Sequence, residues 1–154
     1  MDKTFLQKLY HQHQVCPTCP SPAEVAHIFQ QLLGILFPDF STEAFHDMET
    51  LQAHINRLQQ DFEKMIGNTA GNGRLKASDV ALRFFEAIPK IHQRLEHDIT
   101  AMYEGDPAAK STSEVVRTYP GFYAIAAYRL AHELHRLGKS ATRAVLRTRL
   151  RDAP

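Results

Sequence analysis

The feature that most constrains the fold is a run of apolar residues spaced alternately four and three positions apart. Its members are Leu51, Ile55, Leu58, Phe62 and Met65. This spacing puts all five side chains on one face of an α-helix and does not fit the two-residue repeat of a strand. Asp47 precedes the run as a candidate N-cap, and Gly67 follows it as a stop signal. The middle of the chain is therefore predicted to form one amphipathic helix.

Helix signals also precede this run. Ser21, Pro22 and Glu24 match a capping box with proline at the first helical position. The apolar face that follows consists of Val25, Ile28, Phe29, Leu32 and Leu36. We expect this helix to end at Pro38, because proline cannot continue a helix. A shorter amphipathic helix around Leu6 is predicted before it.

The second half of the chain continues in the same way. Ser78 or Asp79 is predicted to open a helix, and Pro89 to bend or restart it. A turn over 104–111, a short helix and a long helix ending before Gly138 are predicted to follow. With a last helix in 139–154, the sequence predicts an all-α fold of about seven or eight helices. The expected units are residues 1–138 as a helical domain and 139–154 as a basic C-terminal helix or divergent tail.

Composition excludes several classes of protein. The 154 residues are 44% hydrophobic, enough for the core of one domain, and their formal net charge of +1 does not call for nucleic acid or a membrane surface. No apolar stretch approaches the roughly 20 residues that span a bilayer. The N-terminus lacks the pattern of a signal peptide, so we expect a cytoplasmic protein.

Four candidate metal ligands lie close together near the N-terminus. His11, His13, Cys16 and Cys19 form H-x-H-x2-C-x2-C, a set that zinc can accept. The alternative is that the cysteines are two thiols in a loop, because short spans rarely supply four ligands. A small metal-binding domain is one of the hypotheses that follow.

The long helix near the C-terminus carries Tyr128, His132 and His135 at spacings of four and three. Histidines at such spacing can bind metal or transfer protons, but the H-E-x-x-H pattern is absent. A polar face against a neighbouring element is the alternative interpretation. Further on, Arg143, Arg147 and Arg151 form a stripe that is either a solvated face or a contact for phosphates or an anionic membrane.

Asp106 is the candidate binding residue of the predicted turn over 104–111. Pro107 follows it and disfavours helical backbone at Asp106, which directs the carboxylate away from the helices. A carboxylate fixed on a loop can bind an ammonium group through charge-assisted hydrogen bonds.

From Asp98 onward the chain resembles the end of the helical N-terminal region of serine O-acetyltransferases, in the variant with a long N-terminus. The matching positions are Asp98, Ile99 and Ala101; Asp106, Pro107 and Ala108; residues 119–122; and Ala127, Tyr128, Arg129, Ala131 and His132. This family transfers an acetyl group from acetyl-CoA to the hydroxyl of L-serine, which gives O-acetylserine for cysteine synthesis. By the same resemblance, the aspartate of the D-P-A turn helps to hold the substrate serine, and Asp106 occupies that position.

The resemblance also implies where the remaining chemistry lies. In this family a histidine acts as general base, and the catalytic histidines and the CoA groove belong to a C-terminal left-handed β-helix built from hexapeptide repeats. This chain shows no such repeats and departs from the family pattern over residues 139–151. We therefore expect a truncated form with no catalytic residue and no cofactor of its own, inactive alone.

The expected partners are a second copy of the chain or a catalytic β-helix. A stand-alone helical interaction module remains as an alternative function.

Overall fold

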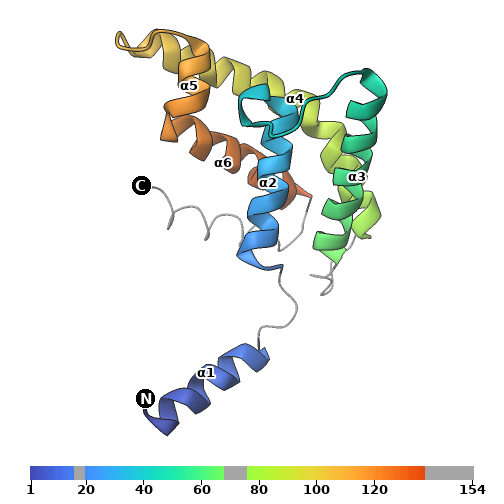
Figure 1. Ribbon diagram of the computed structural model, residues 1–154, viewed down its shortest axis with the longest axis vertical. Coiled ribbons are helices and arrows are strands. Elements are labelled where there is room, and N and C mark those ends of the chain that lie inside the picture. Colours follow the sequence, from blue (N-terminus) through green and yellow to red (C-terminus); the bar gives the residue numbers. More distant parts are fainter. Residues whose placement is uncertain (16–19, 68–75, 138–154) are drawn as a thin grey trace.

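The computed structural model describes residues 1–15, 20–67 and 76–137, and all regular structure in these ranges is helical (Figure 1). The elements are α1 (Lys3–Val15), α2 (Pro22–Leu36), the 3-10 helix η1 (Pro38–Phe40), α3 (Met48–Gly67), α4 (Ala77–Gly105), α5 (Thr112–Thr118) and α6 (Pro120–Arg136). The all-α prediction is confirmed. The six α-helices of the described ranges are fewer than the seven or eight expected, because Pro89 does not divide α4 and residues 139–154 lie outside these ranges.

The start of α2 forms as its sequence predicts. The Glu24 amide donates to Ser21 Oγ at 3.2 Å, and the Ser21 amide donates to Glu24 Oε2 at 2.7 Å, which completes a capping box. The helix ends at Leu36 with Phe37 as C-cap, and Pro38 opens η1 directly afterwards. The stop at Pro38 was predicted, whereas η1 was not.

The α3 helix begins after Asp47, as its sequence predicts. The Thr50 amide donates to Asp47 Oδ1 at 2.7 Å, so Asp47 caps the helix. Burial of the apolar stripe increases along α3: Leu51 and Ile55 are partly buried, and the three residues that continue the stripe toward Gly67 are fully buried. The helix therefore approaches the core through its C-terminal half.

The beginning of α4 differs from expectation. The helix starts at Ala77, with Lys76 as an N-cap that makes no side-chain hydrogen bond, so neither Ser78 nor Asp79 opens it. Pro89 lies inside the 29-residue helix without restarting it. Because Pro89 is exposed, its ring faces solvent, and the buried face that carries Phe84 and Leu95 continues past it.

The long α4 helix organises the packing, since it contacts α3, α5 and α6, while α2 packs on α3 and η1 (Figure 1). Aromatic rings fill the core where these helices meet. The rings of Phe62 and Phe84 stack across α3 and α4 with centroids 4.5 Å apart. The rings of Phe37 and Phe122 meet edge to face at 5.2 Å.

The α1 helix lies apart from the other helices in Figure 1. Its large apolar side chains remain accessible: Phe5 is 49% exposed, Leu6 45% and Tyr10 68%. None of the helices in the described ranges combines the length and apolar character needed to cross a bilayer.

Candidate functional site

Asp106 lies where α4 ends and the chain turns toward α5. It is the C-cap residue of α4, with extended backbone angles of φ −120° and ψ 104°, as expected for a residue that precedes proline. Its Oδ1 accepts a hydrogen bond from the Ala108 amide at 2.9 Å, and its own carbonyl accepts one from the Ala109 amide at 3.0 Å. The side chain is therefore fixed to the turn that it opens.

A second hydrogen bond reaches Asp106 from the corner between α5 and α6. The Tyr119 hydroxyl donates to Asp106 Oδ2 at 2.6 Å across thirteen residues of chain. Tyr119 is both the C-cap of α5 and the N-cap of α6, and Pro120 follows it at the first position of α6. The phenol thus extends from a backbone that two helices hold in place.

The far end of the turn is also held. The Ser111 side chain caps α5 by accepting from the Glu114 amide at 3.1 Å, and Glu114 Oε2 accepts from the Lys110 amide at 2.7 Å. With Asp106 bound at one end and Lys110 at the other, residues 106–111 are fixed by hydrogen bonds at both ends.

Asp106 differs in its partners from the aspartates that form ion pairs between helices. Asp98 and Asp39 pair with Arg129 and Arg117. Asp106 has two neutral donors, and it forms no ion pair with any residue in the described part of the chain.

Both donors also favour the ionised form of Asp106. The Tyr119 hydroxyl, followed by the Ala108 amide, lowers the pKa of this carboxyl. The carboxylate in turn raises the pKa of Tyr119 to about 12, so the phenol remains a proton donor at neutral pH. Asp106 is therefore an oriented anion whose charge no cation in the described ranges compensates.

An ion pair braces the helices that carry the two halves of this site. Arg129 on α6 donates from Nε to Asp98 Oδ2 at 2.5 Å and from Nη2 to Asp98 Oδ1 at 2.7 Å. The pair is partly buried, and the hydrogen bonds that Arg129 donates to the Asp98 carboxylate raise the pKa of Arg129. Asp98 and Arg129 are two of the positions that carry the family resemblance, and the structure brings them into contact although 31 residues separate them.

Only two of the four predicted metal ligands lie in the described part of the chain. His11 and His13 lie on α1, while Cys16 and Cys19 fall outside the described residues, so the zinc hypothesis stays a prediction. Within the ranges that are described, no group of three or more His, Cys, Asp or Glu side chains could hold a metal ion.

The polar face of α6 is solvent-accessible. Tyr128 is 56% exposed, His132 and His135 are exposed, and the Tyr128 and His132 rings lie 5.7 Å apart. Arg143, Arg147 and Arg151 lie outside the described residues.

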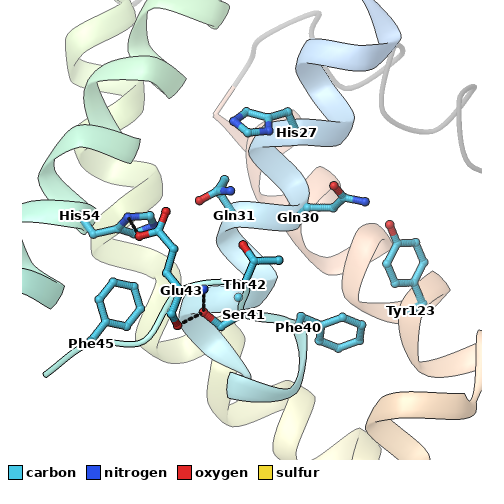
Figure 2. Close-up of a pocket in the computed structure, with 11 residues that line it drawn as sticks. His27, Gln30, Gln31, Phe40, Ser41, Thr42, Glu43, Phe45, His54 and Tyr123 are labelled. Atoms are coloured by element: carbon cyan, nitrogen blue, oxygen red, sulfur yellow. Dashed lines mark hydrogen bonds and ion pairs between the residues drawn. The ribbon is translucent and has the colours of Figure 1, made fainter.

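Figure 2 shows a groove that sequence reasoning missed, with a volume of about 590 Å³. Its floor is one face of α2, formed by His27, Gln30, Gln31 and Gly34, and aromatic side chains line both sides. On one side His54 Nδ1 lies 3.2 Å from Glu43 Oε2. The sequence did carry a signal for this groove. Gln30, Gln31 and Gly34 follow His27 by three, four and seven positions, which places all four residues on one face of α2, apart from its apolar face. Asp106 does not line this groove.

Comparison with known proteins gives a consistent result. A family model described as "Serine acetyltransferase, N-terminal" matches residues 42–127. A plasmid serine acetyltransferase of Synechococcus elongatus is 34% identical over 137 residues, which cover 77% of this chain and 43% of the relative. A serine acetyltransferase of Staphylococcus epidermidis is 43% identical over 44 residues, or 29% of this chain and 21% of the relative.

The fold comparison agrees. The crystal structure of Entamoeba histolytica serine acetyltransferase 1 in complex with L-cysteine matches with a TM-score of 0.67 and 32% identity, covering 79% of this chain and 45% of that one. The chain thus spans less than half the length of the Synechococcus and Entamoeba proteins.

Proposed function

Because the chain belongs to the serine acetyltransferase family and carries its N-terminal helical domain, we propose that it supplies the ammonium-binding carboxylate of a serine site. Asp106 is this carboxylate. The carrying observation is its set of partners: the carboxylate accepts from Tyr119 and Ala108, both neutral donors, and forms no ion pair in the described ranges. A carboxylate has about four lone-pair positions, so two hydrogen bonds leave room for an ammonium group.

The proposed reaction is acetyl transfer from acetyl-CoA to the L-serine hydroxyl. The serine must be oriented before its hydroxyl can attack the thioester, and gripping its ammonium fixes one end of the molecule. Proton removal and acetyl-CoA binding are assigned to the β-helical catalytic domain that the family resemblance implies. The Entamoeba relative was crystallised with L-cysteine, which has the same ammonium and carboxylate as serine, and this supports an amino-acid site in the family.

The test compares acetyl transfer, followed by thiol release from acetyl-CoA, in three samples. They are the chain alone, the catalytic β-helical domain of a relative alone, and the two together. We expect no turnover by the chain alone, and turnover above background would contradict this. Adding the chain to the catalytic domain should lower KM for L-serine at least about tenfold, as expected for a charged hydrogen bond.

Variants identify the residue responsible. Asp106→Asn should abolish this decrease in KM for L-serine. Asp61→Asn, at an exposed aspartate on α3, should retain it. The relative's own helical domain is the positive control. If that domain lowers KM for L-serine and this chain does not, the proposed function is wrong.

We further propose that the chain self-associates through α1. The exposed apolar side chains of Phe5, Leu6 and Tyr10 support this, because such a patch is costly in water. Light scattering should show a mass that rises with concentration and falls toward the monomer in Phe5→Ser/Leu6→Ser. A clean monomer at high concentration of the unmodified chain would contradict self-association.

A further inference from the structure

We propose that Tyr119 is the positioning residue of the serine site, holding the Asp106 carboxylate in the orientation that receives the substrate ammonium. This inference rests on the proposed function of Asp106. It assigns to Tyr119 a role exerted through Asp106, without contact between the phenol and the reacting atoms.

The two hydrogen bonds to Asp106 constrain its carboxylate in different ways. The bond from the Ala108 amide spans two residues and moves with the turn, whereas the bond from Tyr119 reaches a separate corner of the fold. One local bond leaves the carboxylate free to rotate about it. A second bond to the other oxygen fixes both Oδ atoms, and therefore also the directions of the lone pairs that remain.

Tyr119 is suited to this task because its own position is fixed. Its amide donates to the Val115 carbonyl at 3.2 Å, and its carbonyl accepts from the Phe122 amide at 3.1 Å. Its ring is partly buried and packs against the hydrophobic core. The hydroxyl therefore sits at the end of a rigid support, which lowers the entropy that Asp106 must lose when a ligand binds.

The chemistry of the donor also suits the site. A phenol orients the carboxylate without bringing a positive charge, so the anion stays available to an ammonium ion. An arginine would orient it equally well but would neutralise it, as Arg129 does for Asp98. The raised pKa of Tyr119 keeps the donor protonated wherever serine carries its ammonium.

The test uses Tyr119→Phe, which removes the hydroxyl and retains the ring. In the assembly of this chain with a catalytic β-helical domain, KM for L-serine should rise about 3- to 10-fold, the effect of one hydrogen bond. We expect kcat and KM for acetyl-CoA to stay within about twofold. Tyr103→Phe, which removes a hydroxyl from a tyrosine of α4 that is 39% exposed, should behave as the unmodified chain.

A second readout needs no turnover. In the isolated chain with carbon-13 at the Asp106 carboxyl, NMR titration of Tyr119→Phe should show a higher pKa for Asp106, while Tyr103→Phe leaves this pKa unchanged. If Tyr119→Phe does not fold, 3-fluorotyrosine at position 119 retains the ring and strengthens the donor, and the pKa of Asp106 should then fall.

The outcomes separate the two proposals. If Asp106→Asn raises KM for L-serine and Tyr119→Phe does not, Tyr119 has no positioning role and the function of Asp106 stands. If neither variant changes KM for L-serine, the proposed function itself fails. An unchanged pKa of Asp106 in Tyr119→Phe would also overturn the inference.

Discussion

The hydroxyl of Tyr119 donates a 2.6 Å hydrogen bond to Oδ2 of Asp106 and thereby joins the α5–α6 corner to the turn that ends α4. This contact gives the Asp106 carboxylate a defined orientation without neutralising it. The Asp98–Arg129 pair holds α4 against α6. It thereby helps to fix the distance between the backbone of Tyr119 and the Asp106 carboxylate. The geometry of the site therefore depends on the packing of α4 against α6 as well as on the turn.

Arg129→Met should destabilise the fold by about 1–3 kcal/mol, because it leaves Asp98 without its bidentate partner. The expected loss of stability is smaller than for a fully buried pair, because the Arg129 and Asp98 side chains are 28% and 19% exposed. Urea denaturation followed by circular dichroism measures it. Arg117→Met is the matched control: its guanidinium side chain is 65% exposed, so its loss should stay within about 1 kcal/mol. Equal losses in the two variants would contradict the bracing role of Arg129.

Acid should destabilise the protein. Hydrogen bonds lower the pKa of Glu24, Asp39, Asp47 and Asp106, with the Ser21 amide, the Arg117 side chain, the Thr50 amide and the Tyr119 hydroxyl as the main causes. The folded protein therefore binds fewer protons than the unfolded chain, whose ordinary values are 3.8 for Asp and 4.5 for Glu. This stability is present above those values and is lost as the pH falls through the folded ones.

The urea midpoint should accordingly decrease between about pH 5 and about pH 3. Asp47→Asn keeps an N-cap acceptor but cannot titrate, so it should weaken the dependence on pH. A midpoint that rises on acidification would show that these carboxylates do not favour the folded state.

Ser21→Ala should cost about 0.5–2 kcal/mol, because it removes the acceptor of the Glu24 amide from the capping box. Thr100→Ala, on the exposed face of α4, is the control. Its hydroxyl only bonds back to the Glu96 carbonyl, so its removal should change stability by less than about 0.5 kcal/mol. The free energy of unfolding in urea distinguishes the two, and an equal effect would count against the cap.

Phe84→Ala should cost about 3–5 kcal/mol, since the side chain is 1% exposed and stacks on Phe62 in the core. Leu82, two residues earlier on α4, is 51% exposed, and Leu82→Ala should have a small effect. Thermal and urea denaturation of both variants provide the measurement. A mild effect of Phe84→Ala would mean that α3 and α4 are not packed as described.

Local signals predicted much of the fold. The capping box at Ser21, the N-cap at Asp47 and the stripe on α3 depend on residues three or four positions apart, which a sequence displays directly. The start of α4 was predicted wrongly because Ser78 and Asp79 resemble caps, whereas the helix begins at Ala77 with no side-chain cap. Ala77 packs against the hydrophobic core, and no local motif records such a tertiary contact.

The site could be predicted only in part. Asp106 stood out from the sequence because Pro107 and the turn are local features. Its bond to Tyr119 could not be anticipated, because the angle between α4, α5 and α6 decides whether a phenol thirteen residues away reaches the carboxylate. The groove along α2 was missed for the same reason, since its two sides come from separate elements.

The central claim is that Asp106 binds the substrate ammonium, and one comparison tests it directly. In the assembly with a catalytic domain, kcat/KM is measured for L-serine and for 3-hydroxypropanoate, which keeps the hydroxyl and the carboxylate but lacks the ammonium group. The unmodified chain should favour L-serine strongly, and Asp106→Asn should reduce this preference at least about tenfold by lowering only the value for L-serine. An undiminished preference in Asp106→Asn would contradict the account.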